Sequence, residues 1–351
     1  MNDTPPRVSV ILPAYQHAAF VERAVRSVLE QSMRDLELIV VDDASTDGTA
    51  DIVAGIRDER LQLIRSPQNR LLHARNHALV LSRGEYIAFQ NSDDEWLPDK
   101  LEQQLEALQQ QDRVAMFTDV QLIDQDSAAV AGTWASDAFK AKPLSTTPDD
   151  WLRLLFQGNS LCISSALIRR SALERTGPFK PALLQLSDMD LWIRLAGVGN
   201  LAVLPGKLTR MRILPGRNLS TPTAEAINRT LIEHSELLEN YLHSPIFERL
   251  HDVFPEAGIP AHADATLRKA AFALYCSGQG IPHRLFADRQ LSAILNRPLE
   301  REIAQNAYGN TLIKQFWQTR GTLQLVDAAQ PVLPKRTFLQ QLKRVLGRSL
   351  Q

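Results

Sequence analysis

The first half of the chain alternates short apolar runs with segments of helical periodicity. The apolar runs fall at 8–12, 36–41, 61–64 and 86–89. The segments with apolar residues at three- and four-residue spacing fall at about 20–29, 49–57, 73–81 and from 98 onward. Short runs that are apolar on consecutive positions are typical of strands buried on both faces. Alternating strand and helix units predict an α/β fold with a mostly parallel sheet.

The later part of the chain predicts further strands of this sheet, followed by a region of helices. Residues 114–119 and 162–168 are predicted strands, and Ser171 is a predicted cap of a short helix. The segment 127–148 has little periodicity and many small polar residues, which indicates a loop or lid. From about 224 to 330 the periodicity is mainly helical, so we expect a helical region there.

Composition and charge exclude several classes of protein. The 351 residues include 39 Lys plus Arg and 40 Asp plus Glu, so a nucleic-acid-binding surface spread over the whole protein is not expected. Cys162 and Cys276 form no CxxC pair, which argues against a disulfide framework and a thiolate zinc site. Residues 1–7 carry no signal-peptide pattern, and no apolar stretch approaches the ~20 residues of a membrane-spanning helix. We therefore expect a cytoplasmic protein.

Two acidic clusters follow predicted buried strands, Asp42-Asp43 and Asp93-Asp94. In open α/β sheets ligands bind beyond the carboxyl ends of the strands, where both clusters fall. Mg²⁺ and Mn²⁺ use one or two carboxylates and complete their shell with substrate phosphates, so a nucleotide diphosphate is the natural partner. The alternative is structural, because Asp, Asn and Ser also cap helices and form turns.

A series of blocks in the first two thirds of the chain resembles the family-2 glycosyltransferases. The blocks are Val8–Tyr15, Ser27–Ser32, Val40–Thr49, Ala74–Asn76, Gly84–Phe89, Ser92–Asp94, Ser165–Arg170, Gly177–Phe179 and Asp188–Ala196. They cover about residues 7–217. The resemblance implies a GT-A fold, a doubly wound and mostly parallel sheet that binds a nucleotide sugar. It also implies a metal-dependent transferase that inverts the configuration of the sugar.

The resemblance assigns residues to the nucleotide end of the site. Pro13 and Tyr15, with Asp42 or Asp43, would line the base pocket. The Tyr15 ring would stack on the base, and a carboxylate would accept a hydrogen bond from a base N–H. Arg75 would add positive charge near the phosphates, with a solvent-exposed ion pair as the alternative.

The resemblance also assigns the reactive end. Asp94 would bind Mn²⁺ or Mg²⁺, and Asp93 would contact the ribose or the metal. Asp188 matches the position of the catalytic base, which would take the proton of the acceptor hydroxyl as the new bond forms. Trp192 and Arg194 are expected in packing and local pairing, because an aromatic residue on an amphipathic helix usually belongs to the core.

Three positions depart from the family's pattern. Asn91 replaces the first acid of the metal motif, Ser187 replaces a Glu before the base, and Leu214 replaces a His near the metal. A catalytically inactive nucleotide-sugar-binding or scaffold protein is therefore one alternative. The other is a sugar nucleotidyltransferase, which normally has a Gly-rich phosphate loop, whereas residues 13–17 contain no glycine.

These assignments divide the chain into three parts. Residues 1–220 form the predicted catalytic domain, 221–330 the mainly helical region and 331–351 a tail. The tail contains five Lys or Arg and no acid, and its apolar residues fall on one predicted helical face. It is expected either to lie on an anionic membrane surface, where a lipid-linked acceptor would be found, or to pack on protein. The expected partners are a UDP-sugar donor and a glycan or lipid-linked acceptor.

Overall fold

The computed structural model divides the chain into two compact units. The first contains residues 1–155 and 159–218, and the second contains 156–158 and 219–351. The residues that the structure describes are 4–69, 73–110, 112–133, 135, 147–214, 216, 218–219 and 221–322. The basic tail predicted at 331–351 and most of the predicted lid lie outside them.

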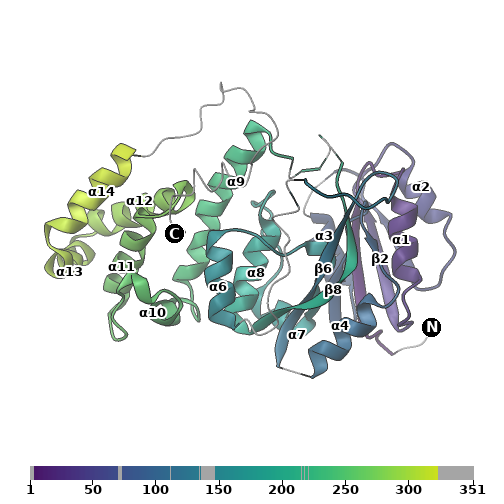
Figure 1. The fold of residues 1–351 in the computed structure, drawn as a ribbon, viewed down its shortest axis with the longest axis horizontal. Helices are drawn as coiled ribbons and strands as arrows, with labels where there is room; N and C mark the ends of the chain where they lie inside the picture. The colour runs from purple at the N-terminus through teal and green to yellow at the C-terminus, as the bar shows by residue number, and fades with distance from the viewer. Residues whose placement is uncertain are drawn as a thin grey trace. The chain divides into compact units, whose positions relative to one another are not determined.

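The first unit is built on one eight-stranded sheet (Figure 1). Its strands are β1 (Val8–Ala14), β2 (Leu36–Asp42), β3 (Leu61–Arg65), β4 (Tyr86–Phe89), β5 (Glu95–Trp96), β6 (Arg113–Ile123), β7 (Leu167–Arg169) and β8 (Asn200–Arg212). The strand order is β3-β2-β1-β4-β7-β6-β8-β5. β3, β2, β1 and β4 pair in parallel, as do β6 and β8, whereas β7 and β5 are antiparallel to their neighbours. The α/β fold with a mostly parallel sheet is confirmed.

Helices cover both faces of this sheet (Figure 1). The helices of this unit are α1 (Val21–Leu29), α2 (Thr49–Ala54), α3 (His73–Leu81), α4 (Lys100–Gln109), α6 (Pro148–Gln157), α7 (Arg170–Thr176) and α8 (Ser187–Val198). Apolar residues of α1, α2 and α4 share one core with alternate residues of β1, β2 and β4. α3 packs on the opposite face, against β1 and β2. The last two residues of α6, Phe156 and Gln157, belong to the second unit. Burial on both faces explains why these strands are apolar at consecutive positions.

The strand predicted at 162–168 is wrong over most of its length. Ile163–Ser165 form a 3₁₀ turn, η1, and only Leu167–Arg169 form a strand. The Ser165 hydroxyl donates to the Cys162 carbonyl oxygen at 2.7 Å, a local bond that competes with extended pairing. Ser171 is not a cap either, because α7 begins at Arg170.

Helices form the described part of the second unit, as the periodicity predicts. They are α9 (Ala224–Leu237), η2 (Leu238–Leu242), η3 (Phe247–Arg249), α10 (Leu250–Val253), η4 (Pro255–Ala257), α11 (Ala265–Ser277), α12 (Ile281–Asn296), α13 (Pro298–Tyr308) and α14 (Asn310–Thr322). The Thr223 side chain caps α9, and Asp264 caps α11. Phe156, Tyr241, Phe254 and Phe272 pack as an aromatic cluster with ring centroids 4.8–6.0 Å apart.

Two buried histidines share one backbone acceptor in this cluster. The Nε2 atoms of His234 and His283 lie 3.1 and 2.9 Å from the Phe156 carbonyl oxygen. A carbonyl can only accept, so each Nε2 carries a proton and donates it to this oxygen. Burial lowers the pKa of His234 to about 4 and that of His283 to about 3. These residues therefore belong to the core and are not metal ligands.

The same pair predicts acid sensitivity. Because the pKa values in the fold lie below the ordinary 6.5, the unfolded chain binds more protons, and stability falls as pH drops below 6.5 toward 4. Between pH 7 and pH 5 we expect a loss of about 1–2 kcal/mol of unfolding free energy for each histidine. Thermal unfolding of the wild type and of His234→Gln/His283→Gln checks this. Equal pH dependence in both proteins would contradict it.

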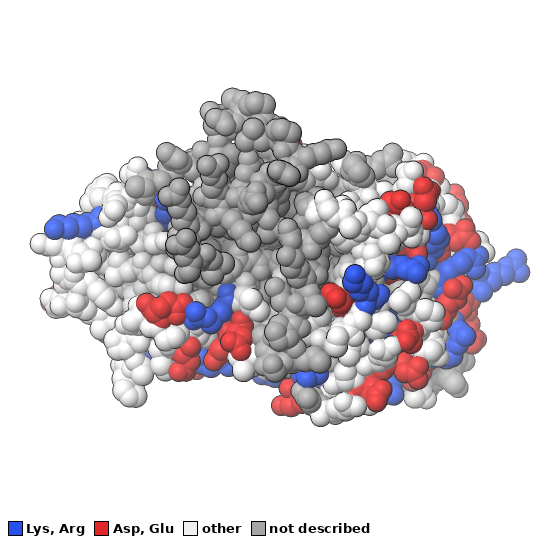
Figure 2. All heavy atoms as spheres, in the orientation of Figure 1, with Lys and Arg blue, Asp and Glu red and all other residues white. Residues whose placement is uncertain are grey.

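The described surface mixes charges of both signs. On the face shown in Figure 2, the coloured Lys and Arg side chains are interspersed with Asp and Glu, without a continuous basic area among them. Across the described residues, none of the helices combines the length and apolar character needed to cross a bilayer.

Candidate active site

Three loops meet at the carboxyl ends of β1, β2 and β4. The Gln16 backbone N–H donates to the Ser45 hydroxyl at 3.0 Å, which joins the first loop to the second. His17 Nδ1 lies 2.7 Å from the Ser92 hydroxyl oxygen, which joins the first loop to the acidic loop after β4. Gln16 (φ 55°) and Ala44 (φ 64°) hold left-handed backbone conformations that residues other than glycine rarely adopt. Such local strain is maintained by surrounding contacts and is often found at functional sites.

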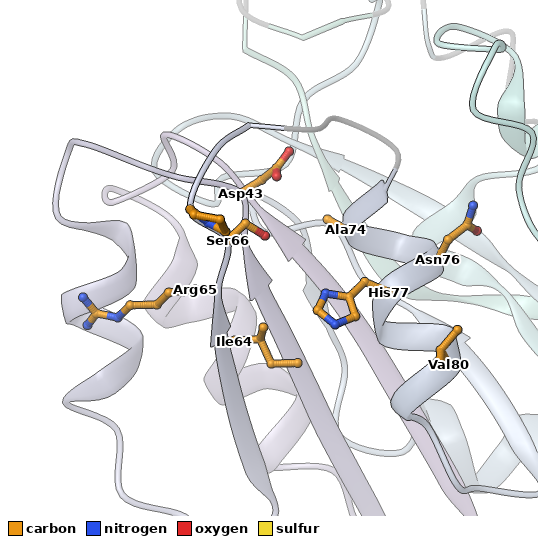
Figure 3. Close-up of a pocket in the computed structure, with 9 residues that line it drawn as sticks. Asp43, Ile64, Arg65, Ser66, Ala74, Asn76, His77 and Val80 are labelled. Atoms are coloured by element: carbon orange, nitrogen blue, oxygen red, sulfur yellow. The ribbon is translucent and has the colours of Figure 1, made fainter.

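The structure separates the two acids after β2. Asp42 is buried, and its Oδ2 accepts from the Ser45 backbone N–H at 3.0 Å, so its side chain forms the turn. Asp43 lines a pocket of about 410 Å³ (Figure 3). Pro13 is half-buried at the end of β1, and Tyr15 keeps 45% of its surface exposed. Of the predicted base-binding residues, Asp43 lines the pocket and Tyr15 is exposed, and their contact with a base stays a prediction.

The pocket is bounded by residues that the sequence did not single out. Ile64 and Ser66 lie at the end of β3, and His77 and Val80 line it from α3 (Figure 3). His77 and Ile64 face the space between these elements, whereas Arg65 pairs with Asp51 of α2 at 2.8 Å. Position at the carboxyl edge of the sheet was the available signal for Ser66.

Asp94 is buried and surrounded by hydrogen-bond donors. Its Oδ1 accepts from the Arg212 backbone N–H at 2.8 Å. Its Oδ2 accepts from the Ser164 hydroxyl at 2.5 Å and from Asn91 Nδ2 at 3.2 Å. Asp93 lies beside it, and the Asp93 carbonyl oxygen accepts from Arg212 Nε at 2.7 Å. Arg212, which the sequence did not single out, therefore supports both acids.

The negative charges of Asp93 and Asp94 are only partly offset by positive charge nearby. Burial raises the pKa of Asp93 to about 6. Burial and the neighbouring Asp93 raise the pKa of Asp94 to about 7. The nearby Arg212 guanidinium contacts Glu95, with which it forms an ion pair. Two buried carboxylates in this state would gain from a bound cation.

The donor set is compatible with a divalent cation that brings other ligands with it. A carboxylate offers about four lone-pair directions, and three of those on Asp94 are occupied. Asp94 can then give one bond to a cation, and Asp93 adds its own carboxylate. The described residues contain no cluster of three or more His, Cys, Asp or Glu side chains that could hold a metal. Asn91 and Leu214 add no charge, so phosphate oxygens and water would complete the shell.

Arg75 links the acidic loop to the predicted base. The side chain is half-buried on α3, which favours the predicted role over a solvent-exposed ion pair. Its Nη2 donates to Asn91 Oδ1 at 3.3 Å, and its guanidinium carbon lies 5.6 Å from the Phe179 ring centroid. Arg75 also interacts electrostatically with Asp188. Asn91 thereby contacts both Arg75 and Asp94.

Asp188 lies in the first turn of α8 and is half-buried. Its Oδ1 accepts from the Met189 backbone N–H at 2.7 Å, and its Oδ2 accepts from Asn159 Nδ2 at 2.9 Å. Burial raises its pKa, while Met189, Arg75 and Asn159 act in the opposite direction. A partly exposed carboxylate with a raised pKa beside an arginine is a reasonable proton acceptor.

The neighbours of Asp188 on α8 have structural contacts. Trp192 is fully buried, and its ring packs edge-on against Phe117 at 4.8 Å. Arg194 pairs with Asp190 at 2.7 Å. Lys180 contacts the other oxygen of Asp190 at 2.8 Å. Trp192 and Arg194 thus have the packing and pairing contacts expected of them, and the Asp190 carboxylate is occupied.

Comparisons with known proteins match this chain to a family model and to curated relatives. The family model described as glycosyl transferase family 2 matches residues 9–177. A Bacillus subtilis (strain 168) protein, TuaG, whose name assigns it to teichuronic acid biosynthesis as a glycosyltransferase, is 33% identical over 255 residues. That match covers 72% of this chain and 92% of the relative. An uncharacterised glycosyltransferase of Rickettsia typhi is 27% identical, with 69% of this chain and 73% of the relative covered.

Solved structures share the fold. The crystal structure of S. aureus TarS 1-349 in complex with UDP-GlcNAc superposes with a TM-score of 0.56 at 18% identity. The superposition covers 90% of this chain and 84% of that one. The expected GT-A type of sheet is therefore confirmed for this chain.

Proposed function

Since this chain belongs to glycosyl transferase family 2, we propose that it moves a single sugar from a nucleotide-diphospho-sugar to an acceptor hydroxyl with inversion at the anomeric carbon. The observation that carries the proposal is the pair of hydrogen bonds that joins Asp94, Asn91 and Arg75, together with the electrostatic interaction between Arg75 and Asp188. Asn91 and Asp94 lie at the carboxyl edge of the sheet, after β4, and Arg75 lies on α3 between two residues that line the pocket with Asp43. In sheets of this type that edge is the ligand-binding edge.

The nucleotide would occupy the pocket between β3 and α3. Asp43 would accept a hydrogen bond from a base N–H, and Tyr15, exposed beside Pro13, would stack on the base. We propose uracil as the base because TarS, with the same fold, was crystallised with UDP-GlcNAc. Ribose would contact Asp93. The transferred sugar would be a hexose.

Asp188 and Arg75 would have different roles at the reactive end of the site. Asp188 would accept the proton of the acceptor hydroxyl as that hydroxyl attacks the anomeric carbon. Its raised pKa favours this transfer, because a stronger base accepts the proton more readily. Arg75 would offset negative charge on the phosphates through its guanidinium. One displacement on the face opposite the leaving group gives inversion.

Asp93 and Asp94 would hold Mn²⁺ or Mg²⁺. A cation at this place supplies positive charge that stabilises the departing diphosphate. Arg212 would keep both acids in place, through its backbone N–H and its guanidinium. The burial of two neighbouring carboxylates supports the proposal, because a bound cation would offset the negative charge that burial disfavours.

A screen of nucleotide sugars tests the proposal on the full chain. Thermal shift and sugar release are measured for UDP-, GDP- and TDP-linked sugars, each with Mn²⁺, with Mg²⁺ and with EDTA. We expect a UDP-sugar to give the largest shift and to be consumed only with a metal. Binding without consumption of any donor would favour the inactive sugar-nucleotide-binding alternative.

For the acceptor we propose a glycan or a lipid-linked glycan of a cell-envelope polysaccharide. The relationship to TuaG, named for teichuronic acid biosynthesis, supports this choice. A lipid-linked acceptor would place the enzyme, otherwise cytoplasmic, at the inner face of a membrane. The segment proposed to make this contact, 331–351, lies outside the described residues, so this part of the proposal rests on its sequence.

Removal of the tail checks the membrane contact. Its five positive charges are each worth about 1 kcal/mol near an anionic surface. We expect the full chain to sediment with vesicles of anionic lipid at low salt, and the chain cut before Pro331 to stay in the supernatant. Neutral vesicles are the control. Equal sedimentation of both proteins would remove the membrane proposal and leave packing on protein.

A further inference from the structure

The predicted base is held by a side chain from a distant part of the sequence. Asn159, just after α6, donates from Nδ2 to Asp188 Oδ2 at 2.9 Å. Asn159 Oδ1 accepts from the Leu161 backbone N–H at 3.0 Å. Because the Leu161 backbone N–H can only donate, the atom of the Asn159 amide that faces it must be the oxygen. The amide nitrogen must then face Asp188.

The other carboxylate oxygen of Asp188 has a donor of its own. The Met189 backbone N–H reaches Oδ1 at 2.7 Å. The two donors act on different oxygens and therefore fix the plane of the carboxylate. Because each oxygen has two lone pairs, lone pairs remain for an acceptor hydroxyl. Asp188 and Asn159 are both half-buried, so neither is sealed from the surface.

Other titratable groups face Asp188 from neighbouring elements. Arg75 of α3 favours the ionised carboxylate. Cys162, before η1, also interacts with Asp188, and burial raises the pKa of its thiol, which stays neutral. Asp190, two residues along α8, is neutralised by Lys180 and Arg194. Asn159 differs from these groups because it carries no charge and acts on Asp188 through a hydrogen bond.

We propose that Asn159 is the positioning residue for Asp188, orienting the carboxylate toward the acceptor hydroxyl through the Nδ2–Oδ2 hydrogen bond. The inference rests on the proposed function. A donor that bonds to a carboxylate favours its ionised form, so Asn159 opposes the effect of burial on the pKa of Asp188. Asn159 thereby favours the ionised form of the base while it holds the carboxylate in one orientation.

The direct test is the titration of Asp188 in the free protein. Aspartate labelled with ¹³C at the carboxyl carbon is followed by NMR, and Asp188→Asn identifies the signal. Asn159→Ala should raise the pKa of Asp188 by about one unit, the size expected for one hydrogen bond to a charged group. Ser160→Ala is the matched control, because the Ser160 hydroxyl is buried in the same segment without a hydrogen-bond partner. It should leave the pKa unchanged.

A variant of equal size guards against misfolding. Asn159→Asp keeps the shape, removes the donor and adds a like charge, so it should raise the pKa of Asp188 further. The inference is overturned if Asp188 titrates alike in Asn159→Ala, Asn159→Asp and Ser160→Ala.

The activity readout links the contact to the reaction. In Asn159→Ala the acidic limb of the kcat–pH profile should move to higher pH by the same amount, and turnover on that limb should fall by up to about tenfold. An unmoved limb overturns the inference. The NMR titration needs neither donor nor acceptor. A wild type without transfer, but with the pKa shift present, therefore counts against the proposed function and not against the Asn159 contact.

Discussion

Asp188→Asn should lower turnover by roughly 10²–10⁴-fold, the usual contribution of a positioned base. Asn keeps the shape of the side chain but cannot take the proton. The structure also argues against a cap role, because Asp188 is the second residue of α8 and Leu186 holds the cap position. The melting temperature and the donor affinity should therefore stay close to those of the wild type.

Asp190→Asn is the matched control for that experiment. Asp190 is fully buried and pairs with both Lys180 and Arg194. Breaking a buried pair costs stability, so this variant should melt at a lower temperature yet keep its turnover per folded molecule. Turnover within a few-fold of wild type in Asp188→Asn would show that the base lies elsewhere.

Asp94→Asn should weaken UDP binding by at least about tenfold in Mn²⁺ and leave it unchanged in EDTA. Asn removes the negative charge and replaces one carboxylate oxygen with an NH₂ group, which cannot bind a cation. Calorimetric titration of UDP into both proteins, with and without metal, measures the difference. Asp99→Ala, which removes an equal charge from the exposed residue before α4, should behave as the wild type. Equal UDP affinity of Asp94→Asn and wild type in saturating Mn²⁺ would contradict the assignment of Asp94 as a cation ligand.

The strands of the first half were predictable because their signal is local. Residues 36–41 and 86–89 are buried on both faces, and this requirement appears directly as consecutive apolar positions. β8 was missed because Pro205, Gly206 and Lys207 interrupt its pattern. Its long pairing with β6, which includes register shifts, stabilises it despite them.

The site was predictable only where its residues follow strands. Three acids, Asp43, Asp93 and Asp94, lie directly after a strand or within a few residues of its end. Because ligands bind beyond the carboxyl ends of the strands in such sheets, the sequence alone predicts these acids at one edge. Ser164 and Arg212 contact Asp94 across separations of 70 and 118 residues, and no local pattern marks them. Asn159 reaches Asp188 across 29 residues for the same reason. The choice between Asp42 and Asp43 likewise needed the turn bond from Ser45.

The anomeric configuration of the released sugar tests the central claim most directly. With the donor that the screen selects, ¹H NMR spectra taken during the first minutes show which anomer forms before mutarotation. From an α-linked nucleotide sugar the account predicts that the β anomer appears first, in wild type and not in Asp188→Asn. Release of the α anomer first, or no release from any donor, would contradict it.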